Sequence, residues 1–511
     1  MSPAMTAHIH SATTIGFEGK IIGVECDTSN SLPNLLIVGL GNKAIEEAKE
    51  RVRSAIRNTR LDFPSKRITV NLAPANLPKN GAHFDLPIAI AILEVSNQIP
   101  AGAAKDTLLV GELALNGDLR PVSGIIGLAE TARKSGLKSI ILPAQNAAQA
   151  SLVQGIAILP ATSLYDAFLH LSGKRRLQQF TEHTGNATPD STPTHSPDFD
   201  DIKGQDTAKR ALLIAAAGGH NLLFSGPPGA GKTMLAKALL SILPPLTGEE
   251  IIETTKLHSL AGENCETIIT SRPFRSPHHS ASTVSLTGGG HNPRPGEISL
   301  AHRGVLFLDE LPEYSRQSLE SLRQPLEDRL INIARANDHV TYPADFLLIA
   351  TQNPCPCGYY SDPDHSCTCS AHQIQSYQKK VSGPLLDRLD MFLEVAKVDI
   401  ERLLDQPSTS NSVTKEMRSK VLKARTIQKL RFNKAGYTNK HMSSSQIPKL
   451  SKLTDSARQI LEKAAGALNI SARGYFKVIR VARTIADLEG SETIQPNHIS
   501  EAVHYRIRKT T

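Results

Sequence analysis

The chain of 511 residues carries 57 Lys and Arg against 49 Asp and Glu, a formal net charge of +8, and 40% of its residues are hydrophobic. This length exceeds the size at which one core usually keeps growing, so we expect roughly two or three domains, and the composition excludes a wholly disordered chain. The first residues lack a basic segment followed by an apolar run, and the longest apolar stretch, Leu86–Val95, is too short to span a bilayer. We therefore expect a cytoplasmic protein without a membrane partner, whose modest positive charge suits a polyanion without requiring one.

Residues 1–172 combine the patterns of helices and strands. The periodic segment Lys43–Asn58 predicts an amphipathic helix, and the apolar runs Arg67–Pro74 and Ser139–Pro143 predict strands. We expect a mixed α and β domain here. The following segment, 173–198, is rich in Ser, Thr, Pro and His and lacks apolar periodicity, which is typical of a flexible linker.

Residues 199–395 alternate short apolar runs with helical segments. The runs Asn221–Ser225, Val305–Asp309 and Phe346–Ala350 predict buried strands, and Thr233–Leu243 has the pattern of a helix. Strands that alternate with helices favour a parallel, doubly wound sheet.

A phosphate-binding loop separates the first of these strands from the helix. It has the two glycines, the lysine and the hydroxyl residue of such loops, in the strand-loop-helix context that the mechanism requires. Backbone N–H groups and the helix N-terminus would bind phosphate oxygens, Lys232 would reach the β and γ phosphates, and Thr233 would coordinate Mg²⁺. The loop consists of Gly226, Pro227, Pro228, Gly229, Ala230, Gly231, Lys232 and Thr233. We expect ATP and Mg²⁺ as cofactors.

Two carboxylates and an amide are expected at the same edge of the sheet. Asp309 and Glu310 end the second strand, and Asn353 follows the third. Parallel strands direct their carboxyl ends to the ligand side of such a sheet. We expect Asp309 to hold Mg²⁺, Glu310 to polarise the attacking water, and Asn353 to orient that water unless it serves only as a turn residue.

The segment Arg272–Tyr314, RPFRSPHHSASTVSLTGGGHNPRPGEISLAHRGVLFLDELPEY, resembles the magnesium-chelatase-like AAA+ ATPases, and among them the ComM/YifB-type proteins. The resemblance implies an ATPase whose subunits assemble into a hexameric ring. It also implies that Arg388, in the segment GPLLDRLD, completes the active site of a neighbouring subunit as an arginine finger. Similarly, Ser471–Leu488 resembles the family's second sensor helix, which places Arg473 on the phosphates.

The same resemblance implies that residues 396–511 form a helical lid. The segment from Lys415 to Lys440 contains nine Lys or Arg and only one Glu. We interpret this excess as a solvated helix face rather than a nucleic-acid site.

Two segments are candidates for contact with the partner on which the ATPase acts. The first lies before Val305 and carries Arg272, Arg275 and Arg294, whose guanidinium groups would either follow a phosphate backbone or brace a neighbouring subunit. The second, Leu330–Tyr342, alternates in polarity around a turn and predicts a β-hairpin. It resembles the channel hairpin of MCM helicases, with Arg335 at the position of their DNA-contacting basic residue.

The N-terminal segments Asn76–Leu93 and Gly111–Pro143 resemble the protease domain of Lon, a ribosomal S5 domain 2-type α+β fold. A Ser-Lys dyad needs a hydroxyl nucleophile and a neighbouring lysine. This chain has His83 and Ile126 at those positions. The resemblance therefore implies a Lon-like domain without peptidase activity, serving as a structural or DNA-guiding collar as in the recombination ATPase RadA.

Four of the six cysteines, Cys355, Cys357, Cys367 and Cys369, lie within fifteen residues directly after Asn353. Two close pairs of thiolates suit a tetrahedral Zn²⁺ ion with a structural role, and His365 or His372 is an alternative ligand. Free loop thiols or disulfides remain open alternatives, although a reducing compartment disfavours disulfides.

These observations and the resemblance together predict a ring-forming ATPase that acts on single-stranded and branched DNA as a helicase or branch-migration motor, promoting recombination of incoming DNA in natural transformation. One alternative is metal insertion of the magnesium-chelatase type. The Lon-like domain argues against this alternative, because we expect the chelatase subunit to lack such a domain. Another is an ATPase that remodels or regulates a polypeptide.

Overall fold

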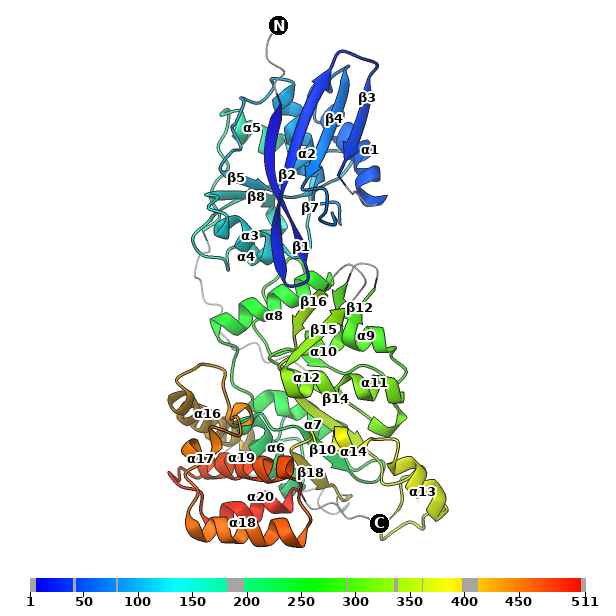
Figure 1. The fold of residues 1–511 in the computed structure, drawn as a ribbon, viewed down its shortest axis with the longest axis vertical. Coiled ribbons are helices and arrows are strands. Elements are labelled where there is room, and N and C mark those ends of the chain that lie inside the picture. Colours follow the sequence, from blue (N-terminus) through cyan, green and yellow to red (C-terminus); the bar gives the residue numbers. More distant parts are fainter. Residues whose placement is uncertain are drawn as a thin grey trace.

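The computed structural model describes residues 6–39, 43–79, 81–181, 197–290, 293–334, 339–360, 362–397 and 412–506. Figure 1 shows an elongated arrangement, with the N-terminal domain at one end, a second α/β domain in the middle, and the C-terminal helices at the other end. Among the described residues, no helix combines the length and the apolar character needed to cross a membrane.

A seven-stranded mixed sheet forms the N-terminal domain, in the order β3-β4-β2-β1-β5-β8-β9. β1 pairs antiparallel with β2, and β5, β8 and β9 extend the sheet in parallel from β1. The strands are β1 (Ala7–Ile15), β2 (Glu18–Ser29), β3 (Asn34–Val38), β4 (Arg67–Ala73), β5 (Thr107–Leu109), β8 (Ser139–Pro143) and β9 (Ala157–Ala161), with a separate ribbon of β6 (Glu112–Leu113) and β7 (Leu119–Arg120).

The helices of this domain bury apolar faces on the sheet. Every residue of α2 (Asp85–Val95) is buried, which explains why the longest apolar run of the chain is a core helix. The amphipathic segment forms α1 (Lys43–Asn58), with the predicted bounds. The others are α3 (Ile125–Lys134), α4 (Ala147–Ala150) and α5 (Leu164–Leu171). After α5 the chain still contacts this domain, because the Phe180 N–H donates to the Ile158 carbonyl at 2.8 Å; most of the expected linker lies outside the described residues.

A five-stranded parallel sheet forms the central domain, in the order β11-β14-β17-β10-β18. The strands are β10 (Leu222–Ser225), β11 (Phe274–Arg275), β14 (Val305–Leu308), β17 (Leu347–Gln352) and β18 (Met391–Glu394). All four residues of β14 and the first three of β10 are buried, as expected for strands with helices on both faces. The parallel sheet confirms the predicted α/β class.

The helices and ribbons of the central domain complete it. The helices are α6 (Asp206–Gly218), α7 (Lys232–Ile242), α8 (Gly248–Ala261), α9 (Thr283–Thr287), α10 (Glu297–Leu300), α11 (Arg316–Ser321), α12 (Arg323–Asp328), α13 (Ala371–Gln378) and α14 (Gly383–Leu386). The ribbons are β12 (Gly288–Gly289) with β13 (Arg294–Pro295), and β15 (Leu330–Ala334) with β16 (His339–Pro343). The second ribbon is the hairpin predicted from the alternating pattern.

The C-terminal helices share one hydrophobic core with the central domain. They are α16 (Val413–Phe432), α17 (Ile447–Leu450), α18 (Asp455–Ala467), α19 (Ala472–Leu488) and α20 (Pro496–His504). Buried residues of α16, α19 and α20 join those of α6 and α7 in a single cluster. These helices therefore share a core with α7, the helix that follows the phosphate loop.

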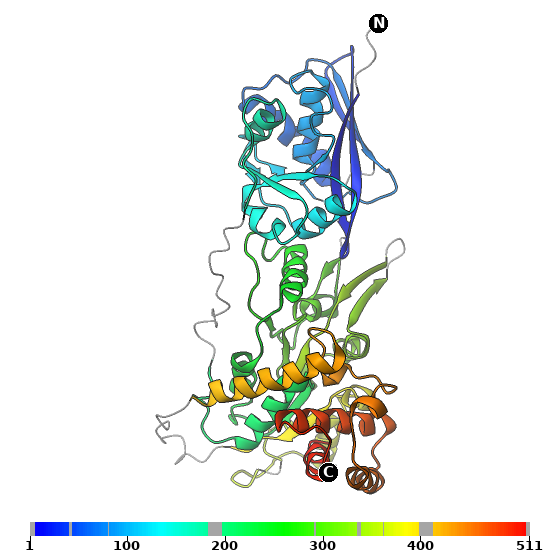
Figure 2. The same ribbon diagram turned by 90° about the vertical axis from the view of Figure 1, so that its left-hand side faces the viewer.

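The N-terminal domain contacts the central domain through α8 and the β15–β16 hairpin. Lys256 on α8 pairs with Glu130 on α3 at 2.6 Å, and the Gly124 N–H donates to the Ser259 hydroxyl at 2.9 Å. The β1–β2 turn, shown in Figure 2 pointing toward the hairpin, packs on Val340 of β16. The hairpin and α8 therefore form one continuous contact surface for the N-terminal domain.

Candidate active site

The phosphate loop leaves β10 and enters α7, as its sequence predicts. Gly229 and Gly231 have φ angles of 78° and 80°, a left-handed backbone that glycine adopts at little cost. A Cβ atom at either position would meet no neighbouring atom within 4 Å, so the space beside the loop is open on that side. Gly226 is a glycine for another reason, because a Cβ atom there would lie 2.2 Å from the Val395 carbonyl oxygen.

Lys232 folds back onto the loop. Its Nζ donates to the carbonyl oxygens of Gly226 and Pro227, at 2.5 and 3.0 Å, and to Oδ1 of Asn353 at 3.0 Å. Burial lowers the pKa of Lys232 from its ordinary value. The structure therefore brings the predicted lysine and the predicted sensor amide together at one point, where a γ phosphate would accept from both.

The two carboxylates lie beside the loop. The hydroxyl of Thr233 donates to Asp309 Oδ2 at 3.1 Å, and the hydroxyl of Thr351 donates to Asp309 Oδ1. The Glu310 N–H donates to the same Thr351 hydroxyl at 3.0 Å, and Glu310 has a φ of 53° with an exposed side chain. Asp309 is thus fixed against the loop while Glu310 turns toward solvent.

A hydroxyl and a carboxylate oxygen are hard oxygen donors of the kind that Mg²⁺ takes together with phosphate oxygens and waters. Thr233 and Asp309 meet at 3.1 Å, so the same Mg²⁺ would be within reach of both. The donor set fits the ion, and the exposed Glu310 lies outside it.

Thr351 was not among the residues predicted from the sequence. β14 and β17 are in register with Leu308 opposite Ala350, so the next residues along each strand, Asp309 and Thr351, face each other. The register of two parallel strands is the signal that would have identified this hydroxyl.

Arg388 and Arg473 converge on one carboxylate. Arg473 donates to Glu327 Oε1 at 3.0 Å, and Arg388 donates to the other oxygen, Oε2. Arg388 also donates to the carbonyl oxygens of Arg323 and Pro384, at 3.1 and 3.0 Å. Both arginines line a cavity of about 470 Å³ between α12, α14 and the start of α19. The structure places Arg473 beside the finger candidate and, among the hydrogen bonds of the described residues, not on the phosphate loop of its own chain.

The three arginines of the first candidate segment differ in their surroundings. Arg272 donates to the carbonyls of Pro244 and Arg303, each at 2.5 Å, and to Glu250 at 3.2 Å. Burial lowers its pKa.

Arg275 forms paired bonds with Glu297 and Glu263, at 2.6 to 3.0 Å, and hydrogen bonding to Glu297 raises its pKa. Arg272 and Arg275 therefore form hydrogen bonds within their own domain. The same N–H groups would have to leave these partners to contact a phosphate backbone. Arg294 on β13 is exposed, and Arg335 lies outside the described residues.

Of the two positions matched to the Lon dyad, Ile126 lies in the core of the N-terminal domain and His83 is partly exposed. Ile126 is fully buried, and the imidazole Nε2 of His83 lies 3.0 Å from the Ala12 carbonyl oxygen. Burial lowers the pKa of His83 to about 4. The structure places no nucleophilic hydroxyl or amine at either position.

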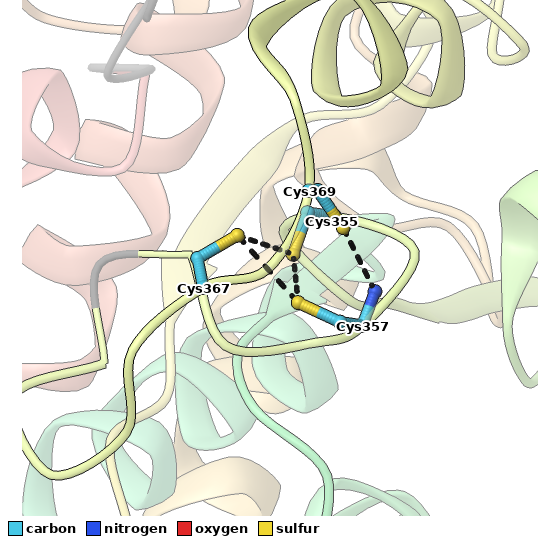
Figure 3. Close-up of side chains that lie close together, drawn as sticks. All are labelled: Cys355, Cys357, Cys367 and Cys369. Carbon is cyan, nitrogen blue, oxygen red and sulfur yellow. Dashed lines mark hydrogen bonds between the residues drawn. The ribbon is translucent and has the colours of Figure 1, made fainter.

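The four cysteines of the loop after β17 face one another (Figure 3). Their sulfur atoms all lie within 4.8 Å of one another, with pairs at 3.3 Å (Cys355 to Cys357), 3.5 Å (Cys357 to Cys367) and 3.7 Å (Cys355 to Cys367). All are free thiols. Neither His365 nor His372 belongs to this group of donors in the described part of the chain.

The parallel sheet, the phosphate loop and the paired Asp309 and Glu310 define a P-loop nucleotide-binding domain. Family models identify the kind of P-loop domain more specifically. The magnesium chelatase subunit ChlI model matches residues 198–403, its C-terminal model matches residues 411–506, and a further model, subunit ChlI of Mg-chelatase, matches residues 24–146.

Relatives match the chain over its full length. Competence protein ComM of Haemophilus influenzae is 46% identical over 506 residues, which are 98% of this chain and 97% of that protein. YifB of Escherichia coli K12 is 42% identical over 98% of this chain and 96% of its own length. The Magnesium-chelatase 67 kDa subunit of Chlorobaculum parvum is 28% identical over 162 residues, 30% of this chain and 23% of that subunit. The chain belongs to the ComM/YifB-type family of magnesium-chelatase-like AAA+ ATPases.

Proposed function

We propose that the protein is an ATP-dependent, ring-forming DNA motor that unwinds or branch-migrates incoming DNA during recombination in natural transformation. The observation that carries this proposal is the match along nearly the whole chain to a competence protein. The contacts of Lys232 with Asn353 and of Thr233 with Asp309 support it. Competence is the uptake of DNA, so DNA is the substrate class that this relative suggests. Such a motor would work in the cytoplasm.

Arg388 and Arg473 support a ring. Both donate to Glu327 and line one cavity, so they form one face of the subunit together. We assign both to the nucleotide of the neighbouring subunit, where their charge would stabilise the developing charge on the γ phosphate. A closed ring of heterologous contacts, with six subunits as the family suggests, supplies such a neighbour at every site.

The β15–β16 hairpin supports a DNA-handling role. Ile333, Val340 and Tyr342 of the hairpin pack with Leu257 of α8 and with Ile15 and Phe17 beside the β1–β2 turn. The pair of Ile333 and Val340 is the second from the outer end of the two strands. Arg335 lies between the two strands in the sequence and outside the described residues; we assign it, with the exposed Arg294, to the DNA phosphates. Arg272 and Arg275 are left out of this role because Glu250, Glu263 and Glu297 already accept their hydrogen bonds.

Metal insertion is the second candidate function. From the sequence we expected the N-terminal domain to argue against a chelatase. That argument fails, because a family model described as a chelatase subunit matches residues 24–146. The discriminating observation is coverage, because the chelatase subunit matches 30% of this chain and the competence protein 98%.

The test measures ATP hydrolysis by the purified full-length protein with no addition, with single-stranded DNA, with a four-way junction, with protoporphyrin and Mg²⁺, and with an unfolded polypeptide. We expect stimulation by DNA and migration of the junction, both absent in Lys232→Ala. Stimulation by protoporphyrin or by the polypeptide, with DNA inert, would reject the proposal in favour of the corresponding alternative.

A further inference from the structure

The cysteine loop has the geometry of a metal site before any metal is added. Three of its sulfur pairs are 3.3 to 3.7 Å apart. A tetrahedral Zn²⁺ with Zn–S bonds of about 2.3 Å needs sulfurs about 3.8 Å apart, whereas a disulfide needs about 2.05 Å. The sulfurs therefore fit ligation of one ion and do not fit a bond to one another.

Backbone groups support the same sulfurs. The Tyr360 N–H donates to Cys355 Sγ at 3.3 Å, and the Cys357 N–H donates to Cys369 Sγ at 3.4 Å. N–H donors of this kind surround a metal-bound thiolate and stabilise its negative charge. Cys355 is fully buried and the other three are partly buried, so the site is closed to solvent on one side.

The loop that the cysteines close is built against the nucleotide site. Cys355 lies two residues after Asn353, whose side chain accepts from Lys232 at 3.0 Å. Gly358, inside the loop, has a φ of 86° and packs directly on the phosphate loop, because a Cβ atom there would lie 2.6 Å from Cδ of Pro228. One short segment thus contacts the phosphate loop at Pro228 and the sensor amide at Asn353.

We propose that Cys355, Cys357, Cys367 and Cys369 bind one Zn²⁺, and that the loop closed by this metal holds the phosphate loop and Asn353 in their nucleotide-binding arrangement. The second half rests on the proposed nucleotide site. Without the metal, nothing would hold the four sulfurs together, so the loop would open and Gly358 would leave Pro228. Metal occupancy would then control ATP binding from outside the site where the ATP chemistry takes place.

The first experiment measures metal content of the full-length protein by elemental analysis. We expect about one zinc per chain in the wild type, as four thiolates define one site. The zinc should fall to background in the Cys357→Ser/Cys369→Ser variant and stay in the matched control Cys265→Ser, a cysteine outside the cluster. Co²⁺ added to metal-free wild type should give the absorption of a tetrahedral thiolate site. Iron in place of zinc, or no metal and no Co²⁺ binding, would overturn the zinc assignment.

The second experiment measures the affinity for a fluorescent ATP analogue. Zinc removal by a chelator should weaken binding by about tenfold, the loss of one good phosphate hydrogen bond, and zinc should restore it. Gly358→Ala should weaken binding similarly while zinc content stays at one. Gly490→Ala is its control, because Gly490 has a φ of 71° and no neighbour within 4 Å of its Cβ position.

The outcomes separate the two layers of the inference. Zinc present with affinity unchanged by chelation and by Gly358→Ala would reject control of the nucleotide site and leave the metal site standing. No nucleotide binding by the zinc-loaded wild type, indistinguishable from Lys232→Ala, would instead reject the proposed nucleotide site itself. Because Gly358→Ala leaves all four thiols in place, the result does not depend on whether a cysteine variant folds.

Discussion

Thr351 organises the hydrolytic site at the scale of single residues. One hydroxyl donates to Asp309 and accepts from the backbone of Glu310. The same side chain therefore positions both the carboxylate that we predict to bind Mg²⁺ and the one that we predict to polarise water. The left-handed backbone at Glu310, with a φ of 53°, turns its carboxylate away from Asp309. Two adjacent acidic residues thereby obtain different roles from their backbone geometry.

Replacement of Glu310 separates nucleotide binding from hydrolysis. In Glu310→Gln the amide keeps the size of the side chain and loses the charge that draws a proton from water. We expect ATP to bind with unchanged affinity and the hydrolysis rate to fall by about 10²- to 10⁴-fold. A fluorescent ATP analogue and a phosphate-release assay measure the two quantities. Lys232→Ala is the contrasting variant, which should lose binding; a Glu310→Gln enzyme with wild-type turnover would exclude Glu310 as the base.

The shared contact of Arg388 and Arg473 with Glu327 predicts complementation between inactive subunits. Lys232→Ala chains keep both arginines, and Arg388→Ala chains keep the phosphate loop. In a ring mixed at equal amounts, about a quarter of the interfaces join a sound loop to a sound arginine, because each interface is heterologous. We therefore expect ATPase activity from the mixture and none from either variant alone. An inactive mixture that still forms rings would place Arg388 on the nucleotide of its own chain.

At the scale of elements, the β1–β2 turn and the β15–β16 hairpin form one unit. Ile15 and Phe17 of the turn pack with Val340, Tyr342 and Leu257. Lys256 Nζ lies 4.2 Å from the ring centroid of Phe17, and the Tyr342 hydroxyl donates to the Pro293 carbonyl at 2.8 Å. The position of the hairpin is therefore set partly by the N-terminal domain.

Filling Gly16 tests this unit. A Cβ atom at Gly16 would lie 2.4 Å from Cγ1 of Val340, so Gly16→Val should push the turn off the hairpin. We expect stimulation of ATP hydrolysis by DNA to fall while hydrolysis without DNA persists. Gly102→Val carries a similar backbone strain, with φ of 73° against 60°, and meets no neighbour. Equal behaviour of the two variants would show that the contact does not matter for DNA stimulation.

The sequence predicted the elements better than the contacts between them. The bounds of α1 and β8 follow from regular apolar patterns, whereas β17 continues past the predicted Ala350 because the polar Thr351 and Gln352 still pair with Phe224 and Ser225. Lys232, Asp309 and Asn353 were predictable because short motifs carry them. Glu327 was not, because its partners lie 61 and 146 residues away and no local pattern connects them.

At the scale of the whole molecule, charged and titratable side chains join the parts of the chain. Asp345 accepts from Arg303 at 3.0 Å and His441 at 3.1 Å and pairs with Lys440 at 2.8 Å, which connects the central domain to the C-terminal helices. Although burial opposes ionisation, Lys440 and His441 hold the pKa of Asp345 well below its ordinary value. The C-terminal helices are thus held by charge as well as by the shared apolar core.

Three histidines with lowered pKa values predict how the stability of the whole chain depends on pH. Burial lowers the pKa values of His83, His220 and His441 to about 4, so the folded chain stays unprotonated where the unfolded chain, near 6.5, takes up protons. Their contribution is present above about pH 6.5 and is lost as pH falls toward 4, by about 2 kcal/mol per histidine at pH 5. Asp85, whose pKa burial raises to about 6, opposes this by about 1 kcal/mol. We expect a lower Tm at pH 5 than at pH 7 by scanning fluorimetry, and a smaller difference in His220→Gln; a pH-independent Tm in the wild type would contradict the prediction.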